Sequence, residues 1–277
     1  MSRSFVAAIL ASCLVTTCWA QSPSTAPAPA KPAPSKPVIK KAAPKAKPAA
    51  KRAAAAESGP CRLGVISVIG DRFSVQKFGV TIFENEATTV PIDWGLDDIV
   101  LARVRAATGA DPTIHRIAFP REAFEPFYNP KSRFIPDPSE RLPAIVRSIT
   151  PTANCERYLV VTTFSAALPD TKMILNGIGT YNQGLGSLLR HSHLFANVSL
   201  TLIDGRTYED ISRPFANFGA NLSQGLRFTE DPLKQLDNSL FPENPASASS
   251  DTTLREKTRA LVAAELDRML PGYLKEE

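Results

Sequence analysis

The sequence has few of the side chains that most often carry catalysis. It contains only three histidines, His115, His191 and His193, and no Gly-x-Ser-x-Gly motif that would present a nucleophilic serine. The glycines between residues 177 and 186 match neither the dinucleotide-binding fingerprint nor the Walker phosphate loop. His191 and His193 would share one face of a strand, but no third metal ligand can be identified for them. The sequence therefore predicts no catalytic residue, no cofactor and no metal site.

Carboxylates occur in neighbouring pairs, such as Asp97 with Asp98 and Glu122 with Glu125. Glycoside hydrolysis would require surroundings that separate the pKa values of two carboxyl groups, and the sequence around these pairs offers no such context. We therefore interpret these side chains as parts of solvated faces.

Positive charge is also scarce in most of the chain, although the formal net charge is +5. Residues 21–60 hold eight of the 32 lysines and arginines and a single acidic residue, Glu57. Residues 61–277 hold 23 basic and 26 acidic side chains, which gives this part a net charge of −3. Because nucleic-acid-binding folds concentrate basic residues on the folded surface, this distribution argues against a nucleic-acid partner.

The first 20 residues are typical of a signal peptide. Arg3 precedes the apolar run 5–15, and small residues at Cys18 and Ala20 fit a cleavage site after Ala20. The run is too short to span a membrane, which takes about 20 apolar residues. A Leu-Ala-Ser-Cys segment ending at Cys13 resembles a bacterial lipoprotein box, but lipidation there would leave a short leader and an apolar new N-terminus. We expect a periplasmic or secreted protein without a transmembrane segment after cleavage; cleavage after Ala20 and lipidation at Cys13 both stay open.

Residues 21–60 form a linker made almost entirely of alanine, proline, lysine and serine. This composition offers too few apolar side chains to offset the entropy of ordering, so we expect the linker to be disordered. One interpretation is a solvated spacer. The other is that its net charge of +7 holds the protein to anionic surfaces, such as phospholipid headgroups or acidic cell-wall polymers.

Removal of the signal peptide leaves two cysteines, Cys61 and Cys155. Each precedes a run that is apolar on both faces, as expected of central strands that are covered on both sides. If the two runs are neighbouring parallel strands, the two sulfurs lie side by side at one end of the sheet. A strand spacing of about 4.8 Å is compatible with a disulfide, and an oxidising compartment favours its formation. The sequence therefore predicts a Cys61–Cys155 disulfide.

The remaining pattern predicts an α/β (α+β) fold, a single domain over residues 61–277 in which helices flank a mixed β-sheet. We expect a first hairpin in which strands 62–69 and 72–83 are joined by Gly-Asp at 70–71, so that Ile66 lies opposite Val75. The further expected elements are a helix from its cap Asp93 to Gly109, strand 114–119, helix 141–149, strand 157–164, a hairpin of 194–203 with 206–211 in which Asn197, Ser199 and Thr201 face solvent, and a long C-terminal helix from about Thr253 to Leu274 that opens with a capping box.

Three segments follow one another in a recognisable order: the strand that begins Arg157-Tyr-Leu-Val-Val, the hairpin 196–209 with its Asp-Gly turn, and the closing amphipathic helix. In this order they resemble small periplasmic domains of the TolB N-terminal, LpoB and CsgG-like type. The resemblance covers residues 61–275 in the order of elements and includes no diagnostic motif. It implies an envelope-associated scaffold that binds partner proteins and is not an enzyme.

Residues 119–143 combine six prolines and five aromatic side chains with interleaved arginine and lysine. Long irregular loops are often functional, and arginine and aromatic side chains are enriched at the energetic centres of protein contacts. The candidate partner-contact residues are Arg121, Phe124, Phe127, Tyr128 and Arg133. The alternative is a flap whose aromatic side chains pack on the core of the protein itself. Residues 214–249, which contain four phenylalanines, allow the same two interpretations.

We therefore expect an exported binding or adaptor module of the cell envelope, non-enzymatic and tethered by its cationic linker. Its partner would be an envelope protein, or the cell wall or another anionic surface reached through the linker. The alternative is an exported hydrolase whose active site lacks a recognisable motif. An enzyme should bring a histidine to a serine or a carboxylate in a polar pocket. An adaptor should present an exposed patch of aromatic and arginine side chains near residues 119–134.

Overall fold

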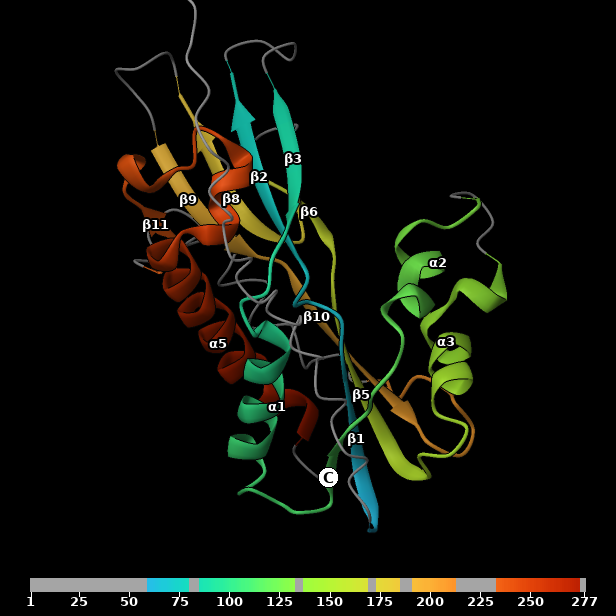
Figure 1. Cartoon of the computed structure of the whole chain (residues 1–277). Helices are drawn as coiled ribbons and strands as arrows, with labels where there is room; N and C mark the ends of the chain where they lie inside the picture. The colour runs from blue at the N-terminus through green and yellow to red at the C-terminus, as the bar shows by residue number, and fades with distance from the viewer. Residues whose placement is uncertain are drawn as a thin grey trace, which may run out of the picture. The chain divides into compact units, whose positions relative to one another are not determined.

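A computed structural model describes residues 59–79, 85–132, 137–168, 173–184, 191–212 and 233–274 of the 277-residue chain (Figure 1). The predicted signal peptide, nearly all of the predicted linker, Arg133 and residues 213–232 lie outside the described residues. None of the helices in the described ranges has the length and apolar character that a membrane span requires.

One four-stranded sheet, sheet A, is built around the two strands that begin with the cysteines. Its strands are β1 (Cys61–Ser67), β4 (Ile114–Arg116), β5 (Cys155–Thr163) and β10 (Val198–Asp204). The strand order is β10–β5–β1–β4; β1 runs parallel to both β4 and β5, and β10 runs antiparallel to β5. β1 and β5 are the central strands and are mostly buried, as runs that are apolar on both faces should be.

A second sheet, sheet B, has five strands, and a small two-stranded hairpin lies beside it. Sheet B contains β2 (Arg72–Phe78), β3 (Glu86–Pro91), β8 (Ile178–Gln183), β9 (His191–Ala196) and β11 (Gln235–Leu236), and the hairpin contains β6 (Ser165–Ala167) and β7 (Ile174–Asn176). The order in sheet B is β11–β9–β8–β2–β3, with β2 and β8 parallel and the other neighbours antiparallel.

The chain passes between these sheets within nearly continuous strands: β1 leads into β2, β5 into β6 and β9 into β10. The predicted first hairpin is therefore wrong. Ile66 pairs with Val160 of β5, whereas Val75 pairs with Thr88 of β3. A strand that is apolar on both faces buries more of its surface between two neighbours and two layers than as one arm of a hairpin. The Gly-Asp dipeptide at 70–71 is the crossover between the sheets.

The second predicted hairpin is correct at its turn but not along its first arm. An antiparallel bridge joins Ile203 to Asp210 around the Asp-Gly turn. The first arm, however, is interrupted at Asn197, which is buried and does not face solvent as predicted. Its Nδ2 donates to the carbonyl of Leu175 over 2.8 Å, which offsets the cost of burying the amide at this break.

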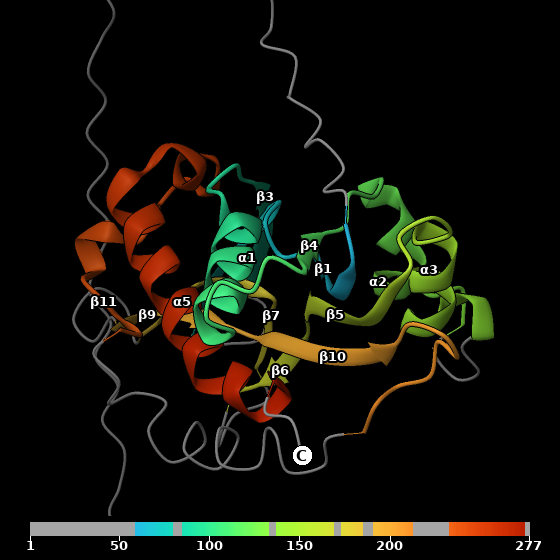
Figure 2. The ribbon, with the colours of Figure 1, turned by 90° about the horizontal axis from the view of Figure 1, so that it is seen from below.

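Helices α1 (Leu96–Ala107) and α5 (Thr252–Leu274) cover one face of both sheets (Figures 1 and 2). Their apolar side chains form one core with Val65 of sheet A and Phe73 of sheet B. Neither predicted N-cap is used. Gly95, in a left-handed conformation, precedes α1, and the Asp251 carboxylate accepts from the backbone nitrogen of Leu254 at the start of α5 (2.9 Å).

The opposite face of sheet A has its own helical cover, formed by η2 (Arg121–Phe124), α2 (Glu125–Tyr128) and α3 (Leu142–Ile149) (Figure 2). The β6–β7 hairpin packs on sheet B through Leu175, which shares a buried cluster with Phe78 and Tyr181, separate from the α1–α5 core. Short 3-10 turns complete the described elements: η3 (Pro138–Glu140), η4 (Asn238–Leu240) and η5 (Pro245–Ser250). The predicted fold class, mixed sheets with flanking helices and a long C-terminal helix, is confirmed.

The predicted disulfide between Cys61 and Cys155 is present. The two residues are direct partners in the parallel β1–β5 ladder, their Cα atoms lie 4.5 Å apart, and both are buried. Gly205 packs beside them: a Cβ atom there would lie 2.8 Å from the carbonyl oxygen of Glu156, so only glycine allows the turn this close. A structural disulfide is consistent with an exported protein.

Candidate binding site

The loop after β4 folds back on sheet A. Phe124 is 1% exposed, and its ring centroid lies 5.1 Å from that of Phe119. Phe127 and Tyr128 are half-buried and meet edge to face at 5.2 Å. These aromatic side chains therefore pack on the core, in the manner of a flap, while the side chain of Arg121 stays partly exposed.

A pocket of about 220 Å³ opens where this loop meets the β6–β7 hairpin. We call it the seam pocket because its walls come from two separate segments, this loop and the hairpin, and from the strands beneath them. The loop contributes Arg121, Phe124, Glu125 and Tyr128, the hairpin and its flanks contribute Phe164, Ser165, Asn176 and Gly177, and the strands and their crossover contribute Val68, Ile69, Asp71, Arg72, Ser74, Thr89, Thr163 and Ile178. Of the predicted contact residues, Phe127 does not line this pocket.

Asp97 of α1 connects the two faces of sheet A at the base of this region. Its buried carboxylate accepts hydrogen bonds from Ser67 Oγ (2.7 Å), the backbone nitrogen of Ile69 (3.2 Å) and Nη2 of Arg121 (2.5 Å). It passes over Gly70, where a Cβ atom would lie 2.7 Å from Asp97 Cγ. The interpretation of Asp97 as a solvated side chain is therefore wrong, because the missing side chain of Gly70 gives the carboxylate its place in the interior.

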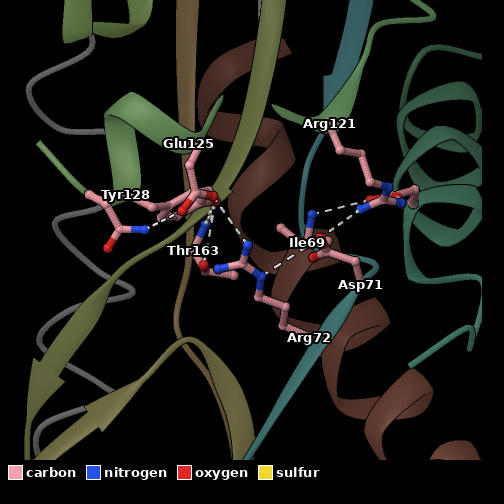
Figure 3. A network of polar contacts seen from close by, with 9 residues as sticks. Ile69, Asp71, Arg72, Arg121, Glu125, Tyr128 and Thr163 are labelled. Carbon is pink, nitrogen blue, oxygen red and sulfur yellow. Dashed lines mark hydrogen bonds and ion pairs between the residues drawn. The ribbon is translucent and has the colours of Figure 1, made fainter. Parts of the chain in front are cut away.

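A second set of contacts ties β2 and the crossover to the loop (Figure 3). Arg72 Nη2 donates to Glu125 Oε2 over 3.3 Å, and Asn129 Nδ2 donates to Glu125 Oε1 over 2.5 Å. Asp71 Oδ2 lies 3.4 Å from Arg121 Nη1 and 3.9 Å from Arg72 Nε. Both arginines of the seam pocket are thus paired with carboxylates, and Glu125 is an ion-pair partner that the sequence had not indicated.

Tyr128 lies against the last residue of β5. Its hydroxyl oxygen accepts from the backbone nitrogen of Thr163 (3.2 Å) and from Thr163 Oγ1 (3.5 Å). Burial is the main cause that raises the pKa of Tyr128 above its ordinary value, so the hydroxyl is protonated at neutral pH. Since the oxygen accepts both of these bonds, the hydroxyl can still donate its own proton to a third group.

Two large apolar side chains are exposed in or next to the seam pocket. Phe164, a wall residue, is 43% exposed, and Ile174 on the adjoining β7 is 55% exposed. In the part of the chain that the structure describes, the other large exposed apolar side chain is Leu233, also at 43%. Exposed apolar side chains beside a pocket are typical of surfaces that contact another molecule.

A second, more open pocket of about 670 Å³ lies at the β9–β11 side of sheet B. Its lining includes a possible set of hydrolase side chains, His191, Ser192, His193 and Asp237. Ser192 Oγ, however, accepts from Asn182 Nδ2 (2.7 Å) and donates to Asn238 Oδ1 (2.9 Å). The serine hydroxyl is therefore held by two amides and not by an imidazole base, which nucleophilic catalysis would require.

Of the two histidines of this pocket, His191 is exposed and His193 is half-buried. His193 stacks on Tyr181 with ring centroids 5.2 Å apart, and its pKa is lowered mainly by burial and further by His191. His115 is buried in β4. Among residues 59–79, 85–132, 137–168, 173–184, 191–212 and 233–274, no three histidine, cysteine or acidic side chains gather as metal ligands would.

Sequence reasoning identified the loop half of the seam pocket and missed the other half. Composition indicated Arg121, Phe124 and Tyr128. The contributions of Arg72 and Phe164 depend on strands that are distant in sequence, and no local pattern marks either residue.

Comparison with known proteins finds no matching family model, no similar curated protein and no similar solved structure. The resemblance to TolB N-terminal, LpoB and CsgG-like domains stays a prediction.

Proposed function

We propose that this chain is an exported, non-enzymatic binding module of the cell envelope, and that it receives part of a partner protein in the seam pocket. The observation that carries the proposal is the combination of a small, partly apolar pocket with two exposed apolar side chains, Phe164 in its wall and Ile174 on the adjoining strand β7. Such a combination is typical of the centre of a protein contact, where a side chain of one protein is buried in a pocket of the other.

The size of the pocket favours a protein partner over a metabolite. Small-molecule sites usually enclose about 300–1,000 Å³. The seam pocket, at about 220 Å³, is smaller than this and suits one inserted side chain with its neighbouring peptide group. The exposed side chain of Ile174 extends the contact beyond the pocket, as a protein surface would and a small ligand would not.

The chemistry of the pocket also supports binding. Arg72 and Arg121 are paired with Glu125, Asp71 and Asp97, which leaves no isolated charge to activate a nucleophile or take up a proton. The proton of the Tyr128 hydroxyl offers a hydrogen bond to a neutral acceptor, such as a peptide carbonyl. The pocket can therefore hold an apolar side chain and orient the backbone that carries it.

The linker supplies the tether in this proposal. Its net charge of +7 would hold the module near anionic lipid or cell-wall polymer by an attraction that salt screens over about 10 Å at 0.1 M. Deletion of residues 21–58 should abolish sedimentation with anionic vesicles at low salt, and unchanged sedimentation would remove the tether from the proposal.

Site-specific photo-crosslinking tests the binding role. A photoreactive amino acid at position 164 of the full chain should crosslink one envelope protein, and the same amino acid at position 233 is the matched control because Phe164 and Leu233 are equally exposed, at 43%. Phe164→Ala should reduce capture of that protein about tenfold, as expected for loss of a central aromatic contact, whereas Leu233→Ala should not. Equal crosslinking from both positions, or none from 164, would overturn the proposal.

A further inference from the structure

One edge of sheet B ends beside the seam pocket. In the described part of the chain β3 pairs only with β2, so its other side is an open edge. The backbone nitrogen of Ile92 donates to the carbonyl of Asp71 over 3.0 Å. This bond shows which alternate residues of β3 direct their backbone N–H and C=O groups toward β2. Residues 90 and 88 accordingly bond to β2, and the backbone groups of Ala87 and Thr89 point away from it.

The middle of this edge carries no charge and no proline, two of the features that prevent strand addition. Ala87, Thr88 and Thr89 are exposed and uncharged, with the strand's acidic residue, Glu86, at one end and Pro91 at the other. Edge strands in monomeric proteins are commonly protected by central lysines, bulges or covering segments. The middle of β3 therefore presents unpaired donors and acceptors to which an extended segment can add.

The seam pocket lies on one face of sheet B, next to the open edge of β3. Thr89 pairs with Ser74 in the β2–β3 register, and both side chains line the pocket. Directly opposed residues in a sheet share a face, so a residue placed opposite Thr89 by an added strand points to the pocket side as well.

We propose that the partner adds an extended strand to β3 and places a large apolar side chain in the seam pocket. This inference rests on the proposed function and specifies its mode of recognition: main-chain hydrogen bonds supply affinity, and the pocket selects the side chain. A second copy of β3 is a poorer occupant, because its own side chains on either face, apart from one valine, are small or polar and would leave the apolar walls unfilled.

A peptide probe tests the inference without knowledge of the partner. The probe is an acetylated heptapeptide of serine and threonine with a central phenylalanine, and its matched control carries a central alanine. We expect the phenylalanine peptide to bind the full chain at least about tenfold more tightly, as burial of one aromatic side chain implies. Thr89→Pro removes one outward N–H that an edge strand does not need, and should weaken binding about fivefold.

Amide exchange measured by NMR shows where the peptide binds. Saturating phenylalanine peptide should slow exchange of the Ala87 and Thr89 amides about tenfold and leave Thr88, already bonded to β2, unchanged. Binding without protection of Ala87 and Thr89, or no binding of the phenylalanine peptide, overturns strand addition; the crosslinking result at position 164 still decides the proposed function on its own. Protection that grows with protein concentration in the absence of peptide would identify a second copy as the occupant and overturn the inference.

Discussion

At the scale of single residues, Asp97 and Gly70 form a matched pair. The carboxylate of Asp97 satisfies groups on both sides of sheet A, and it can do so only because Gly70 has no side chain. We expect Gly70→Ala to destabilise the protein by about 1–3 kcal/mol, since a methyl group there overpacks the carboxylate and displaces it from its partners. Urea unfolding followed by circular dichroism measures the loss.

A double-mutant cycle separates this clash from a general effect of the substitution. In an Asp97→Ala background the Gly70→Ala change should cost clearly less, because the atoms that it would meet are gone. Equal costs in both backgrounds would show that the backbone conformation at Gly70, and not the carboxylate, requires glycine.

Tyr181 gives a residue-scale prediction about pH. Burial raises the pKa of its hydroxyl from 10.0 to about 12, so the folded protein keeps this proton over a range in which the unfolded chain loses it. Its contribution to stability is therefore complete below pH 10 and is lost as the pH rises to about 12. Tyr181→Phe should reduce this alkaline loss of stability, measured by urea unfolding at a series of pH values. Identical alkaline slopes for both proteins would contradict the assignment.

At the scale of elements, the central strands were predictable and the strand crossings were not. The runs after Cys61 and Cys155 are apolar on both faces, which predicts central strands, and the disulfide was expected on the condition that these strands are parallel neighbours, as they are in the structure. Gly-Asp at 70–71 has the composition of a tight turn, yet it carries the chain from one sheet to the next. The crossover follows from the two neighbours that β1 gains in sheet A, β4 and β5, and no local sequence window contains either strand.

The candidate site divides in the same way. Composition identified Arg121, Phe124 and Tyr128 because arginine and aromatic side chains in a proline-rich loop form an unusual pattern. The facing wall comes from Phe164 and Asn176, whose position depends on how the β6–β7 hairpin docks on sheet B. Sequence alone therefore indicates a contact loop. The pocket forms only when both this loop and the β6–β7 hairpin have packed on the sheets.

The side chain of Gln76, on β2, links the β6–β7 hairpin to sheet B. With its amide turned so that each atom has a partner, the 1%-exposed side chain donates to the carbonyl of Ile174 (2.9 Å) and accepts from the backbone nitrogen of Asn176 (3.1 Å). Gln76→Ala removes both bonds. Hydrogen exchange in residues 165–167 and 174–176 should become at least about tenfold faster, the equivalent of roughly 1.4 kcal/mol.

The control for this prediction lies within the same molecule. Exchange at Val160 and Val161 of β5 should not change, because their strand belongs to sheet A, whereas Gln76 belongs to sheet B. If both regions exchanged faster together, the substitution would be destabilising the whole fold, and the special role of Gln76 in fastening the hairpin would be wrong.

At the scale of the whole molecule, the charge separates into a basic linker and a mildly acidic remainder. The linker carries +7 and residues 61–277 carry −3, so a net charge of +5 describes neither part. A binding module needs this separation if the linker is to hold an anionic surface while the seam pocket contacts a protein. The two attachments then respond to different conditions: salt weakens the first, whereas burial of apolar side chains at the second depends little on salt.

The disulfide constrains the first part of the chain after the linker, residues 61–155. It joins residues 94 positions apart and closes a loop that contains β2, β3, α1, β4 and the covering loop of the seam pocket. In the chain-entropy model a loop of this length stabilises the folded state by about 4–5 kcal/mol, because it restricts the unfolded chain. We expect the Cys61→Ser, Cys155→Ser double variant to lose about that much in urea unfolding, and the oxidised wild type to lose a similar amount when a reductant is added. A loss below about 1 kcal/mol in both cases would mean that β1 and β5 hold their parallel register without the covalent bond.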